Sequence, residues 1–183
     1  MINNNVFLKK TGNNDFTWEK LSNIYEGRGD LGGEMPVLVY RLMQFTLLDV
    51  LSKGVGADEA NEYFRKAGFL AGSEFAKNVL NLQVSFNTFV ANLQEVLEDL
   101  KIGILRMEAF DQDSGNITLT VEQDLDCSGL PVTGETVCIY DEGFLAGILQ
   151  VYTGKDYEVL EVDCWATGDR VCRFRGSPLD LNS

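Results

Sequence analysis

The hydrophobic pattern of this chain changes its period near residue 101. Before that point apolar residues recur at helical spacing, and after it two stretches alternate between apolar and polar residues, as strands do. The turn-forming run Asp113-Ser114-Gly115 separates these two stretches and predicts a hairpin. Helices that come first and hairpins that come last predict an α+β fold with an antiparallel sheet, and not an alternating parallel one.

The expected order is N-terminal helices followed by a β-β-α-β-β unit. The expected helices cover residues 16–25, 36–52, 58–80, 85–100 and 135–151. The expected strands cover residues 104–110, 116–123, 157–162 and 171–174. No Pro- or Ser-rich linker divides the chain, so we expect one domain over residues 1–183, with a helical part (1–100) and a part (101–183) that carries the sheet and all four cysteines.

Two of the expected helices have unusual surfaces. The helix over residues 36–52 is apolar nearly all round, which favours burial or a subunit interface and hence a homodimer. The helix over residues 58–80 carries Gly68 and Gly72 four positions apart. Each interior glycine costs a helix about 1 kcal/mol relative to alanine. We therefore expect a neighbouring element to approach this face closely.

Histidine is absent from all 183 residues. This absence excludes a Ser-His-Asp triad, a His-ligated haem and every metal site that uses histidine. The formal net charge of −13 argues against a nucleic-acid partner, because binding a phosphate backbone requires clustered Lys and Arg. We see no nicotinamide or flavin fingerprint and no catalytic base, so we expect no catalytic residue and binding without chemistry.

The chain is expected to be cytoplasmic. Residues 1–11 are polar and do not resemble a signal peptide. The most apolar window, residues 36–51, is interrupted by charged and polar side chains and is shorter than the roughly 20 residues that a membrane span needs. In a reducing compartment the four cysteines are free thiols or metal ligands rather than disulfides.

Three cysteines and a carboxylate fall in the second half of the β-β-α-β-β unit. Cys138 is expected in the first turns of a helix, Glu161 and Cys164 at the end of a strand, and Cys172 at the start of its hairpin partner. Three thiolates and one carboxylate suit tetrahedral Zn²⁺, whereas buried cysteines without a metal are also common. Cys127 lies in a turn-rich stretch away from this cluster, and we expect an unliganded thiol there.

Three runs, residues 126–131, 137–147 and 161–174, resemble the 4-vinyl reductase-type domain family. This family includes a protein tied to bacteriochlorophyll synthesis and the phenol-sensing domains of bacterial enhancer-binding activators. It is structurally related to subunits of a eukaryotic vesicle-tethering complex that hold an acyl chain. The resemblance implies a small-molecule-binding, usually dimeric domain with a hydrophobic pocket between helices and sheet.

The resemblance also implies a structural zinc. In the phenol sensors the metal is bound by Cys, Glu, Cys and Cys in that order, and the spacings of Cys138, Glu161, Cys164 and Cys172 match position for position. Those sensors read the phenol hydroxyl with a histidine, which this chain does not have. We therefore expect an apolar or aromatic ligand that is recognised in another way.

The expected pocket combines apolar residues from two helices and one strand: Phe89, Ile117, Leu119, Tyr140, Phe144 and Ile148. The last three recur one turn apart and are expected to face the sheet, although filling the core is the alternative for each. The favoured function is a cytosolic zinc-containing domain that senses a hydrocarbon, aromatic or lipid molecule and acts through a partner. An accessory protein or reductase component of tetrapyrrole metabolism and a dimeric scaffold remain alternatives.

Overall fold

The computed structural model describes residues 16–179. The chain falls into two compact units, which meet in sequence between Glu34 and Met35, and each unit is described by itself. The expectation that residues 1–11 are not a signal peptide lies outside the described residues.

The first unit contains two short helical segments in place of one expected helix. The 3-10 helix η1 (Trp18–Leu21) precedes α1 (Ile24–Gly27). The prediction of a continuous helix over residues 16–25 is wrong, because the backbone of Ser22 turns to a φ of 60° and interrupts the helical path. Asn23 then caps α1, and its side chain accepts a hydrogen bond from the backbone N–H of Glu26 at 3.2 Å.

The second unit contains four longer helices, close to the expected ranges. They are α2 (Val37–Val55), α3 (Ala57–Val79), α4 (Phe86–Asp99) and α5 (Ile139–Thr153). None of the helices among the described residues is long and apolar enough to cross a membrane.

The start of α5 is four residues later than expected. The backbone N–H groups of Val137 and Cys138 donate to the carboxylate of Glu161, at 3.1 and 2.9 Å. The N–H groups of Thr133 and Gly134 both donate to the carbonyl oxygen of Ala166. These contacts hold the residues before α5 against the β3–β4 hairpin, so the helical pattern seen from residue 135 begins only at Ile139.

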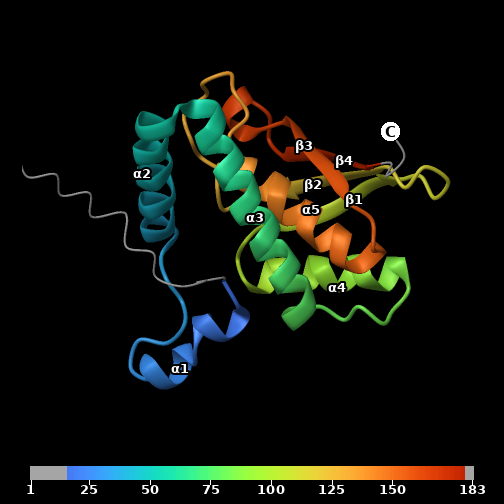
Figure 1. Ribbon diagram of the computed structural model, residues 1–183, viewed down its shortest axis with the longest axis horizontal. Coiled ribbons are helices and arrows are strands. Elements are labelled where there is room, and N and C mark those ends of the chain that lie inside the picture. Colours follow the sequence, from blue (N-terminus) through green and yellow to red (C-terminus); the bar gives the residue numbers. More distant parts are fainter. Residues whose placement is uncertain (1–15, 180–183) are drawn as a thin grey trace, which may run out of the picture. The chain divides into compact units, whose positions relative to one another are not determined.

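Helices α3 and α5 run side by side and touch through glycines on both helices (Figure 1). A Cβ added at any of four positions would lie 2.0–2.3 Å from a backbone oxygen of the other helix. These positions are Gly68 and Gly72 on α3 and Gly143 and Gly147 on α5. The expected close approach to the α3 glycines is therefore confirmed, and α5 is the element that makes it.

The sheet has four strands and is antiparallel throughout. Its strands are β1 (Ile104–Phe110), β2 (Ile117–Glu122), β3 (Tyr157–Asp163) and β4 (Cys172–Pro178), in the spatial order β1-β2-β4-β3. The predicted α+β class and both hairpins are confirmed. The pairing of β2 with β4, which joins the two hairpins, runs from Ile117 opposite Gly176 to Val121 opposite Cys172.

One face of the sheet carries the apolar core. Ile117 and Leu119 on β2 and Phe174 on β4 are buried on it, as the period-2 rule requires. The Cδ1 atom of Leu149, on α5, lies 3.5 Å from where a Cβ of Gly176 would stand, so α5 packs against this face. The cysteines lie at the end of the sheet where β3 ends and β4 begins.

Candidate metal centre

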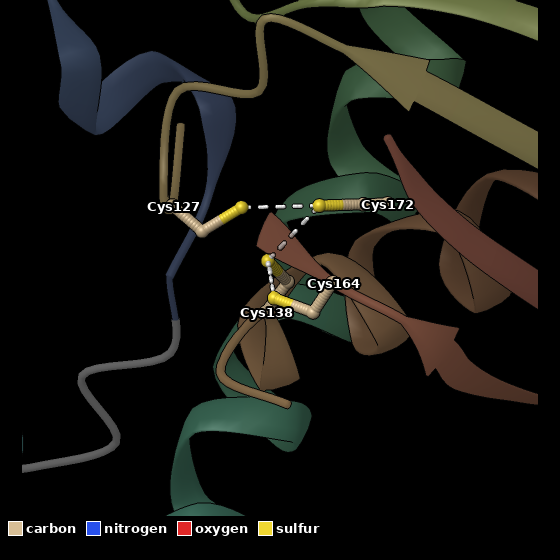
Figure 2. A group of neighbouring side chains, drawn as sticks. All are labelled: Cys127, Cys138, Cys164 and Cys172. Atoms are coloured by element: carbon tan, nitrogen blue, oxygen red, sulfur yellow. Dashed lines mark hydrogen bonds between the residues drawn. The ribbon is translucent and has the colours of Figure 1, made fainter. Parts of the chain in front are cut away.

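The four cysteines meet although they come from four different segments. Cys127 lies in the loop after β2, Cys138 precedes α5, Cys164 follows β3, and Cys172 begins β4. Figure 2 shows their sulfur atoms converging. All four side chains are buried and none forms a disulfide.

Cys164 and Cys172 meet because of the hairpin register. Asp163 pairs with Arg173 across the β3–β4 hairpin, so the residues just outside that pair lie opposite each other. The 3-10 helix η2 (Trp165–Thr167) turns the chain between them, and the N–H of Cys164 donates to the hydroxyl of Thr167 at 3.0 Å. The sequence-based prediction of a hairpin that brings these two cysteines together is confirmed.

The spacing of the sulfur atoms fits a tetrahedral metal–thiolate centre. All four Sγ atoms lie within 4.8 Å of one another. The Sγ atom of Cys138 is 3.8 Å from that of Cys172 and 3.9 Å from that of Cys164, and the Sγ atoms of Cys127 and Cys172 are 3.0 Å apart. Four Zn–S bonds of about 2.3 Å in tetrahedral geometry separate the sulfurs by about 3.8 Å. The two distances from Cys138 match that spacing, and the Cys127–Cys172 pair would widen to it, so the residues present fit a zinc ion.

Without a metal, the thiols share protons unequally. Hydrogen bonds from the other three thiols lower the pKa of Cys164, while hydrogen bonds with neighbouring thiols raise the pKa of Cys138 and of Cys172. The cluster on its own thus favours the thiolate at Cys164 over a thiolate at Cys138 or Cys172. A divalent cation would allow the remaining sulfurs to ionise as ligands.

Glu161 lies beside the cluster and holds the start of α5. Its Oε2 atom accepts the two backbone hydrogen bonds from Val137 and Cys138, and its Oε1 atom is buried without a hydrogen-bond partner. Burial raises the pKa of the Glu161 carboxyl to about 8. Its own N–H donates to Glu142 at 2.8 Å, and the other carboxylate oxygen of Glu142 pairs with Arg65 at 2.7 Å.

Cys127 is part of the cluster, and the prediction that it lies away from the other cysteines is wrong. The carboxylate of Asp124 accepts hydrogen bonds from the N–H groups of Asp126 and Cys127, at 2.8 and 3.1 Å. This tight turn directs the side chain of Cys127 inward to Cys172. The turn-forming letters of residues 126–129 signal such a loop, but they do not tell which way its cysteine points.

Helix α2 holds the loop that carries Cys127. The guanidinium of Arg41 donates to the carbonyl oxygens of Leu125 and Ser128, at 2.7 and 2.9 Å, and reaches that of Asp124 at 3.4 Å. On either side of it, Tyr40 donates to one carboxylate oxygen of Asp126 and Gln44 to the other, at 2.8 and 2.6 Å. Sequence reasoning did not find these contacts, because more than eighty residues separate the partners.

Several buried carboxyl groups surround the cysteines. Burial, assisted by the charge of Asp126, raises the pKa of Asp124 to about 6. Burial also raises the pKa of Asp126 and, strongly, that of Asp141. Asp124 and Asp141 with Cys138 form a second group of potential ligands within 4.8 Å. This acidic surrounding favours a cation in the centre.

The six residues expected to line a pocket do not all share one side of α5. Phe89, Ile117, Leu119 and Ile148 are buried. The ring of Phe89 stacks on Tyr152 at 3.9 Å. The ring of Phe144 lies 5.3 Å from that of Phe75, so Phe144 contacts α3, whereas the sequence predicted that it faces the sheet. Its neighbour Tyr140 is half-buried, and its backbone contacts Gly68 of α3.

The chain resembles known proteins in sequence and in fold. Residues 117–178, which include three of the four strands and all four cysteines of the cluster, match the vinyl-4-reductase domain family. The resemblance to the 4-vinyl reductase-type family is thereby confirmed. An uncharacterized protein of Methanocaldococcus jannaschii is 28% identical over 145 residues, which cover 79% of each chain.

Two solved structures share the fold. The phenol-responsive sensory domain of the transcription activator PoxR, crystallised with phenol, superposes with a TM-score of 0.61 at 18% identity over 80% of this chain and 76% of that one. A vinyl-4-reductase family protein from Methanocaldococcus jannaschii superposes with a TM-score of 0.57 at 17% identity over 81% of this chain and 85% of that one.

Proposed function

We propose that this chain is a cytosolic, zinc-containing small-molecule-binding domain that signals through a partner and does not transform its ligand. The observation that carries the proposal is the match to the vinyl-4-reductase domain family together with the shared fold of a phenol-responsive sensory domain. The buried four-cysteine cluster supports the zinc. Residues 1–183 would act as one functional domain.

The ligand we propose is apolar or aromatic. Its pocket would be lined by Phe89, Ile117, Leu119 and Ile148, and Tyr140 and Phe144, which contact α3, would bound it on that side. Most of these side chains are buried, so a ligand among them would be enclosed and desolvated. A surface groove of about 440 Å³ between α3, α5 and β3 suits such a ligand less, because Glu62, Arg65 and Glu142 line it. With no histidine in the chain, a ligand hydroxyl would be read by another group.

The zinc we propose is structural. Cys138, Cys164 and Cys172 would hold it, with Glu161 as the fourth ligand by resemblance to the phenol sensors. When bound, the zinc would cross-link segments that are distant in sequence. A closed set of four protein ligands leaves no coordination position for an activated water. The residues themselves bring α5, the end of β3 and the start of β4 to one point.

A homodimer through α2 is part of the proposal. Among the described residues, α2 has no buried side chain in the single chain. Leu38, Leu42 and Val50 are 75%, 62% and 65% exposed, which is unusual for leucine and valine on a surface helix. A second copy of the chain would cover this face.

A ligand screen tests the proposed function. Hydrocarbons, phenols, fatty acids and tetrapyrroles are added to purified protein, and thermal shift and calorimetry are recorded. We expect a saturable stabilisation by at least one apolar class and no turnover when a reductant is added. Phe144→Ala should change the preference among these ligands without changing the zinc content. The control Leu160→Ala, whose side chain lies on the exposed face of β3, should change neither property. Turnover would favour the reductase alternative, and a screen without any hit would favour the scaffold.

A further inference from the structure

We propose that Cys127 is the fourth zinc ligand, so that the centre is all-thiolate and Glu161 supports it from outside. This inference rests on the proposed zinc and changes its ligand set. As a consequence, the metal would bind the loop after β2, which Arg41 of α2 holds, and would thereby connect α2 to the end of the sheet.

The sulfur of Cys127 already lies inside the cluster. It lies within 4.8 Å of each of the other three sulfurs, and it is 3.0 Å from that of Cys172. A zinc ion held by the other three sulfurs would therefore have the Cys127 sulfur within reach, and binding it would widen the Cys127–Cys172 pair to about 3.8 Å. Four sulfurs complete a closed tetrahedral site, and thiolates are the ligands that Zn²⁺ takes in structural Cys₄ centres.

The carboxylate of Glu161 already binds the backbone that leads into α5. One of its oxygens accepts hydrogen bonds from the N–H groups of Val137 and Cys138, and those bonds fix the entry to α5 that presents the Cys138 sulfur. Among the described residues, the carboxylate of Glu161 does not join the group of close ligand atoms that the four cysteines form. Its buried second oxygen, Oε1, has no hydrogen-bond partner, and it is the atom that the competing three-sulfur set would use. Five side chains could thus supply the four zinc ligands. Of the two that compete for the fourth position, Cys127 has its ligand atom inside the cluster and Glu161 does not.

Cys127 is held in position by contacts from its own loop and from α2. Asp124 closes the turn around its backbone N–H, and Arg41 binds the carbonyl oxygens of Leu125 and Ser128 on the two sides of it. Tyr40 and Gln44 hold the adjacent Asp126. A ligand loop that is fixed before the metal arrives loses little conformational freedom on binding. The same contacts mean that a metal on Cys127 restrains the half of α2 that carries these three side chains.

X-ray absorption at the zinc edge of the full chain, purified without added metal, tests the ligand set directly and requires no variant. We expect a first shell of four sulfurs. Three sulfurs and one oxygen would overturn this inference while leaving the proposed zinc intact. A protein without zinc would instead contradict the metal of the proposed function.

Matched variants give a second readout, in competition with a chromophoric zinc chelator. Loss of an outer contact to a ligand typically lowers metal affinity by roughly 10–100-fold. We expect Cys127→Ser to lower the zinc affinity by more than about 100-fold. Glu161→Gln should lower it by no more than about 10–100-fold, because the amide oxygen of glutamine still accepts the two N–H bonds. The reverse order would overturn the inference.

Hydrogen exchange tests the connection to α2. Removing zinc from the wild-type chain with a chelator should accelerate exchange of the backbone amides of residues 124–128 and of the first turns of α2, with α4 as the internal control. Exchange in this loop and helix that does not change between the zinc-bound and the zinc-free chain would contradict the connection.

Discussion

Replacing Gly68 by alanine tests the contact on which the position of α5 depends. The new Cβ would lie 2.0 Å from the backbone oxygen of Tyr140, and ordinary contact begins at 3.4 Å, so the helices would have to separate by about 1.4 Å. Helix α5 cannot yield easily, because its opposite side packs on the sheet through Leu149. Overpacking costs typically 1–3 kcal/mol, and alanine regains about 1 kcal/mol of helix propensity. Because the new Cβ meets backbone atoms of α5, which cannot rotate away, the cost lies at the upper end of that range, and we expect a net loss of about 2 kcal/mol in the free energy of unfolding.

The assay is urea denaturation of the metal-replete protein, followed by circular dichroism. With an m-value of about 2 kcal/mol/M, the midpoint should fall by about 1 M. The matched control is Gly54→Ala, which lies inside α2 with nothing within 4 Å of the new Cβ and should gain up to about 1 kcal/mol. If Gly68→Ala were as stable as the wild-type protein, the account of the α3–α5 contact would be refuted.

Three other properties of the protein are expected to respond to defined changes. In metal-free protein, stability should fall as the pH rises from about 5 to about 8, because the buried Glu161 carboxyl, with its pKa raised from 4.5 to about 8, keeps a proton that the unfolded chain has released. Thermal melts of Glu161→Gln should show a smaller slope, and the part that remains comes from the raised pKa values of Asp124 and Asp141. Arg41→Ala should lower the free energy of unfolding in urea by about 2 kcal/mol, since charged hydrogen bonds to the partly buried carbonyls of Leu125 and Ser128 are lost. A loss below about 0.5 kcal/mol, as expected for exposed Lys53→Ala, would contradict the role of Arg41 in holding this loop. Sedimentation at micromolar concentration should show a dimer that Leu42→Glu dissociates, and a wild-type monomer would exclude the α2 interface.

Local patterns in the sequence were sufficient for most of the fold. Period-2 alternation placed β1 at its observed bounds, and the spacing of Gly68 and Gly72 indicated a close helix contact. The loop between the last two strands predicted a hairpin in which Cys164 meets Cys172, whereas the shift in register between Glu161 and Asp163 was not predicted.

The sequence was less informative wherever contacts between distant residues decide the structure. The late start of α5 depends on hydrogen bonds from Glu161, which lies more than twenty residues further along the chain. The inward direction of Cys127 depends on the turn closed by Asp124 and on the side chains of α2. Phe144 packs on Phe75 because glycines let α3 approach that side of α5. None of these partners is marked by spacing along the chain.

Native mass spectrometry of the full chain, purified without added zinc, tests the central claim most directly, because one spectrum reports metal, ligand and assembly together. The account predicts one zinc per chain, carried by a dimer, with a mass increment for an apolar ligand when one is retained or supplied. A bare monomer that binds neither zinc nor any apolar compound, with four freely titrating thiols in the folded protein, would contradict it.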